Sequence, residues 1–207
     1  MDGFTRDPET AGGAIGKSPA RLMARRAVEG RARHVDDLTL PRTVDVAYVR
    51  SPFAHADIGE IDTTAASAVP GVIAVVTGAE IAERMTSWIG IMDNMPALKS
   101  VPQYALAVER AVWQGEPVVA VVAETRSIAE DAAELVVVDW QERPAVADML
   151  TALDPDTPVL HPEIGDNQMY ERAAEKGDVA AAFASAAHVV EGTYDFGRHP
   201  AVTLEPR

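Results

Sequence analysis

The apolar positions of this chain follow two different periods, and each change of period marks a predicted element. Residues 72–78 and 117–124 are unbroken runs rich in β-branched side chains, a pattern typical of strands that are buried on both faces. Val44, Val46 and Tyr48 alternate with other side chains, which predicts a half-buried strand whose buried face carries these three side chains. The predicted strands outside the two runs are residues 43–51, 135–140 and 188–198.

Capping residues and helical spacing predict the helices between these strands. Thr77 and Glu80 have the spacing of a capping box, in which a hydroxyl and a carboxylate bind the first free N–H groups of a helix. Ser127 and Glu130 repeat this spacing ahead of an apolar stripe with helical period. The predicted helices cover residues 61–71, 78–85, 127–136 and 178–186, and a short basic helix or turn begins at Arg21.

Strands and helices alternate without forming one regularly wound array, so the sequence predicts an α+β, or mixed α/β, core. The stretches without periodicity are an N-terminal arm at residues 1–19, an irregular excursion at residues 86–104 and a proline-rich connection at residues 141–168. These stretches divide the chain without indicating what the predicted core does.

Composition narrows the classes of function. The 207 residues are 47% hydrophobic and 24% charged, which suits a globular protein. A net charge of −14 argues against nucleic acid and membrane partners, although Arg21 to Arg33 is locally basic. The absence of cysteine excludes disulfides and thiolate-bound metals from the chain. Arg25 and Arg26 are followed by no apolar segment of an export signal, so the expected location is the cytoplasm.

Two motifs suggest chemistry and lack its usual context. Residues 11–18 approach a phosphate-binding loop ending in Lys17, but Ala11 replaces the first glycine and no strand precedes it, so a flexible arm is favoured over nucleotide binding. Ser51, His55 and Asp57 contain the residue types of a serine triad. No glycine-rich nucleophile turn accompanies them, so the end of a strand is the favoured interpretation.

Isolated polar residues offer further candidates. His34 lies near Asp36 and Asp37, where a solvated loop is favoured over a metal site, and no histidine pair has helical metal-binding spacing. In residues 114–117 a turn with an unusual φ at Gly115 competes with a loop that faces a cofactor or partner. Glu205 needs a cationic partner such as Arg198 or Arg207 wherever it is buried.

Four blocks in a fixed order carry a family resemblance. They are "IGKSPARLMARRAVEGRARHVDDL", "AYVRSPFAHADIGEIDTTAASAVPGVIAVVTGAEI", "WQGEPVVAVVAETRSIAEDAAELVVVDW" and "GDVAAAFASAAHVVEGTYDFGRHPAVTLEPR". From Ile15 to Arg207 the chain resembles the N-terminal part of the molybdenum-binding large subunit of the xanthine dehydrogenase, aldehyde oxidase and carbon monoxide dehydrogenase family.

The resemblance implies three parts: an arm at residues 1–27, an α/β hammerhead domain at residues 28–150, and at residues 151–207 a proline-rich connection with the first helix and strand of a molybdopterin-binding domain. It also implies a complex that hydroxylates a heteroaromatic or aldehyde substrate with oxygen from water. Its molybdopterin, expected as the cytosine dinucleotide, and its [2Fe–2S] clusters and FAD would lie on partner chains.

The family's cofactor loop and catalytic glutamate lie beyond the matching region, so no residue of this chain is assigned a catalytic or metal-binding role, and its cofactor-binding residues are unknown. Arg198, His199 and Glu205 are expected to pack or to form an interface. The leading hypothesis is a split large subunit, in which this non-catalytic structural chain meets a molybdenum-binding catalytic chain, an iron–sulfur subunit and an FAD subunit. A truncated large subunit, a free-standing hammerhead-fold scaffold and a nucleotide-binding protein that uses Lys17 are the alternatives.

Overall fold

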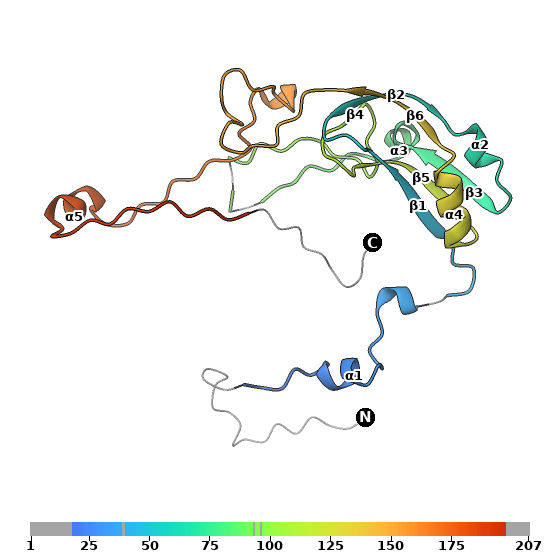
Figure 1. Cartoon of the computed structure of the whole chain (residues 1–207), viewed down its shortest axis with the longest axis horizontal. Coiled ribbons are helices and arrows are strands. Elements are labelled where there is room, and N and C mark those ends of the chain that lie inside the picture. The colour runs from blue at the N-terminus through green and yellow to red at the C-terminus, as the bar shows by residue number, and fades with distance from the viewer. Residues whose placement is uncertain (1–17, 39, 93, 96, 198–207) are drawn as a thin grey trace. The chain divides into compact units, whose positions relative to one another are not determined.

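The computed structural model describes residues 18–38, 40–92, 94–95 and 97–197 (Figure 1). The chain divides into two units, residues 42–193 and a smaller unit of residues 1–41 with 194–207. In the smaller unit, α1 (Ala24–Val28) and the 3-10 helix η2 (Val35–Asp37) are the described helices. The predicted basic helix near Arg21 is thus confirmed. None of the helices in the described ranges is long and apolar enough to cross a membrane.

The larger unit contains two three-stranded antiparallel sheets. In the first, β5 (Pro117–Ala123) lies between β1 (Asp45–Arg50) and β3 (Val72–Thr77). In the second, β2 (Ala56–Asp62) lies between the two-residue β4 (Arg110–Ala111) and β6 (Val137–Glu142). Strands and helices thus form the predicted mixed fold.

The core forms around the central strand β5. Val118, Val119 and Val121 are fully buried, and they pack with apolar side chains from both sheets and from the helices. Trp140 of β6 joins this core from the second sheet and meets Phe53 edge-on, with 6.1 Å between ring centroids. The prediction of a buried strand at residues 117–124 is therefore confirmed.

Short helices lie between the strands and after the last of them. They are α2 (Thr64–Ser67), α3 (Gly78–Arg84), α4 (Arg126–Ala133), η3 (Pro162–Ile164) and α5 (Val179–Ser185). Thr77 and Glu80 form the predicted capping box at α3. At α4 the predicted cap is wrong: Thr125, not Ser127, accepts the hydrogen bond from the Ile128 N–H. Figure 1 shows α4 packed against the sheet of β1 and β5, in agreement with its contacts.

The predicted covered face of β1 is also wrong. Val46 and Tyr48 are 46% and 44% exposed, whereas Val49 packs against the core. Val46 lies opposite Val122, and Tyr48 lies opposite Ala120, so β1 and β5 share an open apolar face. Both faces of β1 carry apolar residues, and alternation alone therefore cannot identify the buried one.

Two other strand predictions need correction. Residues 72–77 form an edge strand with Ile73 57% exposed, so β3 is not buried on both faces. Residues 188–197, the described part of the predicted last strand, have no partner strand and are exposed throughout. An isolated segment has no neighbouring backbone with which to form a ladder. The predicted interface residues Arg198, His199 and Glu205 lie outside the described residues, as does Lys17.

Candidate functional site

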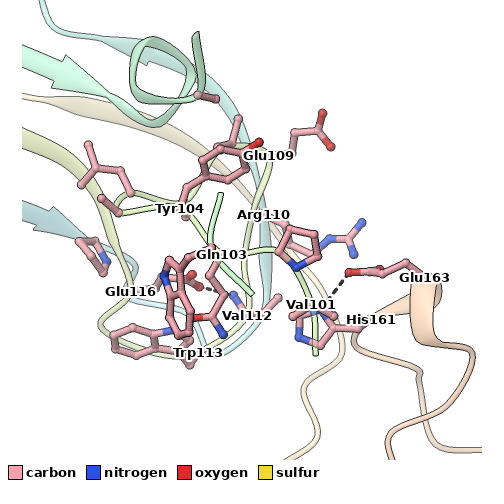
Figure 2. Close-up of a pocket in the computed structure, with 18 of the residues that line it drawn as sticks. Val101, Gln103, Tyr104, Glu109, Arg110, Val112, Trp113, Glu116, His161 and Glu163 are labelled. Atoms are coloured by element: carbon pink, nitrogen blue, oxygen red, sulfur yellow. Dashed lines mark hydrogen bonds and ion pairs between the residues drawn. The ribbon is translucent and has the colours of Figure 1, made fainter. Parts of the chain in front are cut away.

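A pocket of about 1110 Å³ opens beside β4. Its walls come from α3, the irregular segment after it, β4, the turn before β5, and η3 with His161. Figure 2 shows His161 and Glu163 on one side of this pocket, across from Glu116, Val112 and Trp113. Segments distant in the sequence therefore meet here.

Backbone contacts hold the irregular segment in place. The N–H and C=O groups of Trp88 and Gln103 bond each other reciprocally at 2.9 Å, which closes the excursion predicted at residues 86–104. The Ala107 N–H donates to the Pro117 C=O at 2.8 Å. A Cβ on Gly78 would lie 1.9 Å from the Ala107 carbonyl oxygen, so only glycine lets α3 approach this wall.

Glu116 closes the turn that precedes β5. Its carboxylate accepts a hydrogen bond of 2.7 Å from the Val112 N–H, and burial raises the pKa of Glu116. Gly115 has a φ of 92°, a conformation that glycine adopts without strain, and Pro117 begins β5. This φ confirms the predicted turn with an unusual φ at Gly115. The hydrogen bond from the Val112 N–H shows that a backbone group holds the Glu116 carboxylate.

Asp57 ties the second sheet together across its strands. Its carboxylate on the central strand β2 pairs with Arg110 of β4 and with Arg143, which follows β6. The Arg143 guanidinium is the main cause that holds the pKa of Asp57 below its ordinary value of 3.8, and Arg110 adds to the effect. Arg110 lies in the pocket wall, so this clamp fixes part of the wall.

We expect Asp57→Asn to make the stability of the protein less sensitive to acid. Because the folded state lowers the pKa of Asp57, the charged carboxylate stabilises the fold above pH 3.8, and this contribution is lost as the pH falls through the folded-state pKa. The variant should therefore be less stable than the wild type at pH 6, with a smaller difference below pH 3.8. Urea unfolding at both pH values measures this, and an equal difference at both would contradict it.

The segment that carries η3 is fastened by side chains that sequence analysis did not single out. Lys99 Nζ binds both carboxylate oxygens of Asp166, at 2.8 and 2.7 Å, and the Lys99 N–H donates to the Met169 C=O. Asn167 donates to the Ala152 and Pro158 carbonyls and accepts from the Leu160 N–H. A lone asparagine in a proline-rich stretch gives no sequence signal for such a role.

Asn167→Asp should open the loop of residues 151–167. The substitution keeps the acceptor oxygen but replaces both donated hydrogen bonds, each 2.9 Å, with repulsion from two carbonyl oxygens. Leaving such groups unpaired costs about 1–3 kcal/mol, which corresponds to cleavage of the loop that is roughly 5- to 150-fold faster in limited proteolysis. Asn94→Asp makes the same charge change at an exposed position and should leave the cleavage rate unchanged. Equal rates for both variants would contradict the role of Asn167.

The candidate serine triad does not assemble. The buried Ser51 bonds the backbone of Phe53, while His55 Nδ1 lies 2.7 Å from the Pro144 carbonyl oxygen. Asp57 is occupied by its two arginines. Each of the three thus has a local structural role. The His34 N–H bonds the Asp37 carboxylate, and no metal-binding group of three or more histidine or acidic side chains occurs among the described residues.

Comparison with known proteins decides the family. Residues 29–144 match the a/b hammerhead domain of aldehyde oxidase and xanthine dehydrogenase. The chain belongs to the xanthine dehydrogenase and aldehyde oxidase family. Residues 160–207 match the molybdopterin cofactor-binding domain of such proteins. The resemblance inferred from the four sequence blocks is therefore confirmed.

Three members of this family illustrate the similarity. The nicotine 6-hydroxylase large subunit of Paenarthrobacter nicotinovorans is 36% identical over 97% of this chain and 24% of its own length. The carbon monoxide dehydrogenase large chain of Afipia carboxidovorans is 37% identical over 78% of this chain and 19% of its own length. The crystal structure of quinoline 2-oxidoreductase from Pseudomonas putida 86 has a TM-score of 0.74 at 37% identity, over 87% of this chain and 23% of its own. The chain thus spans about a quarter or less of these relatives.

The described residues do not fit the molybdopterin that the family implies. Three carboxylates, Glu109, Glu116 and Glu163, line the pocket, whereas the cofactor carries anionic phosphate. Residues 171–197, within the molybdopterin-domain match, are exposed throughout and enclose nothing by themselves. We therefore assign no contact with the cofactor to these residues.

Proposed function

We propose that this chain supplies the hammerhead domain and the first part of the molybdopterin-binding domain of a molybdenum hydroxylase that acts on a heteroaromatic ring. The main support is the match of residues 29–144 to the hammerhead domain, followed in order by the match of residues 160–207. The nicotine 6-hydroxylase large subunit, which aligns over 97% of the chain, is the relative on which the ring substrate is proposed.

The role proposed for these residues is structural. We divide the chain into an arm at residues 1–27, the hammerhead domain at residues 28–150, and the start of the molybdopterin-binding domain at residues 151–207. Lys99 and Asp166 hold the hammerhead domain against the segment that follows it. Asp57 with its two arginines braces the second sheet within the hammerhead domain. No residue of the chain is given a catalytic role.

The cofactors and partners belong to the proposed assembly as a whole. When bound, molybdopterin, in its cytosine dinucleotide form, would supply the centre at which oxygen from water is transferred to the ring. Electrons would leave through [2Fe–2S] clusters and FAD on partner subunits in the cytoplasm. The clusters need cysteine ligands, and this chain has no cysteine, so they would lie on other subunits. The remainder of the molybdopterin-binding domain would hold the molybdenum.

Purification of the tagged protein from its native host tests this proposal. We expect molybdenum and iron in the purified material, and turnover of pyridine- or quinoline-type substrates with label incorporated from H₂¹⁸O. A chain of 207 residues beside a separate molybdenum-binding chain would support the divided large subunit. Material free of both metals would overturn the proposed function.

A further inference from the structure

The pocket beside β4 gathers a large share of the chain's scarce aromatic side chains. Two of the three tryptophans, Trp88 and Trp113, and one of the four tyrosines, Tyr104, line it. Trp88 is 57% and Trp113 is 51% exposed. Tryptophan and tyrosine dominate the binding energy at protein interfaces when a partner covers them. This concentration therefore points to an interface with another polypeptide.

One wall of the pocket already belongs to the molybdopterin-binding domain. His161, Pro162 and Glu163 line the pocket, and they lie just inside the match that begins at residue 160. Lys99 and Asp166 fasten the following residues to the hammerhead domain. A domain is built around one core, so the remainder of this one must pack close to its own first residues. That remainder therefore comes against the pocket.

The charges of the pocket indicate what the occupant carries. Three carboxylates and two basic side chains line the pocket. Arg110 is paired with Asp57 and His161 lies 3.3 Å from Glu163, so the negative charge that remains is on Glu109 and on Glu116, whose carboxylate accepts from the Val112 N–H. Glu109 is exposed at the rim. A cation beside tryptophan rings gains attraction from the ring faces and from the surrounding carboxylates. A lysine or arginine fits this setting better than an acid or a purely apolar group.

We propose that the pocket seats a segment of the remaining molybdopterin-binding domain, which inserts a lysine or arginine beside Trp88 and Trp113. This inference rests on the proposed function, because that function supplies the occupant. The seat is an interface that positions one domain on the other, and it is separate from the chemistry of the molybdenum centre. A peptide segment on the same polypeptide or on a second one satisfies it equally.

Hydroxyl-radical footprinting of the purified assembly tests whether a peptide segment occupies the pocket. The oxidation rates of Trp88 and Trp113 are compared with that of free N-acetyltryptophanamide in the same sample. With the pocket open, as here, each should react at roughly half the free rate, in line with exposures of 57% and 51%. With the segment seated, we expect less than about a tenth of the free rate, because buried aromatic groups at interfaces are shielded from water.

The same footprinting measurement on a charge-reversed variant tests whether the occupant is cationic. Glu109→Arg with Glu163→Arg repels a cationic occupant, and both positions are exposed enough to accept arginine. Oxidation of both tryptophans should then rise at least about threefold. Glu60→Arg with Glu142→Arg, an equal change on exposed positions of β2 and β6 outside the pocket, should leave it unchanged.

The outcomes separate the two proposals. An assembly that contains molybdenum but oxidises both tryptophans at half the free rate overturns the seat and leaves the proposed function intact. Protected tryptophans that ignore the double charge reversal overturn the cationic occupant. Material without molybdenum overturns the function itself, and the seat falls with it.

Discussion

Val121→Asp is expected to destabilise the protein severely. Val121 lies on the central strand β5, is fully buried, and packs in the core that joins both sheets. A carboxylate there would lose its hydration without gaining a cationic partner, which costs about 4 kcal/mol or more. Since domains are stable by only about 5–15 kcal/mol, the variant should lose a large part of its stability and unfold at a much lower urea concentration than the wild type. Circular dichroism with urea titration measures this directly.

Val46→Asp is the matched control for this substitution. It makes the same chemical change on the neighbouring strand β1, but at a side chain that is 46% exposed on the open face. We expect a loss of about 1 kcal/mol, the scale of strand propensity. Similar losses at both positions would show that the burial of β5 is assigned to the wrong face.

Gly78→Ala is expected to destabilise the protein although it places a better helix former in α3. Alanine ordinarily gains up to about 1 kcal/mol over glycine inside a helix. Here the new methyl group would lie 1.9 Å from the carbonyl oxygen of Ala107 and 2.7 Å from its carbon, both of them backbone atoms. Such overpacking costs about 3 kcal/mol and should move the pocket wall.

Gly90→Ala separates this steric effect from a general effect of losing glycine. At Gly90 the nearest atom to an added Cβ is the Ser100 hydroxyl oxygen at 3.4 Å, an ordinary contact. Urea unfolding should therefore place Gly90→Ala close to the wild type and Gly78→Ala well below it. A stabilised Gly78→Ala protein would contradict the close approach of α3 to Ala107.

Sequence patterns predicted where helices and strands occur better than they predicted cap contacts and the position of each strand in its sheet. The run at residues 117–124 and the Thr77–Glu80 capping box each depend on local chemistry, and both occur as expected. At α4, Thr125 and Ser127 are both hydroxyl residues near the helix start, and the sequence does not show which hydroxyl meets a free N–H. The sequence also does not show which strand is central, because a central strand and an edge strand can have the same β-branched composition.

The candidate site was less predictable because long-range packing creates it. Trp88 and Trp113 lie 25 residues apart, and His161 lies still further along the chain. Only the unusual placement of tryptophan in a proline-containing excursion could have drawn attention to the pocket. The Asp57 clamp joins three strands whose pairing no local pattern reveals.

The placement of the three tryptophans gives the protein two separate optical signals. Trp140 is held edge-on against Phe53 in the core, while Trp88 and Trp113 stand at the mouth of the pocket. Acrylamide, a neutral quencher that meets exposed tryptophans far more often than packed ones, should report mainly on the second group. The emission of Trp140 should instead follow the loss of its packed surroundings. Docking and denaturation can therefore be followed in one unlabelled sample.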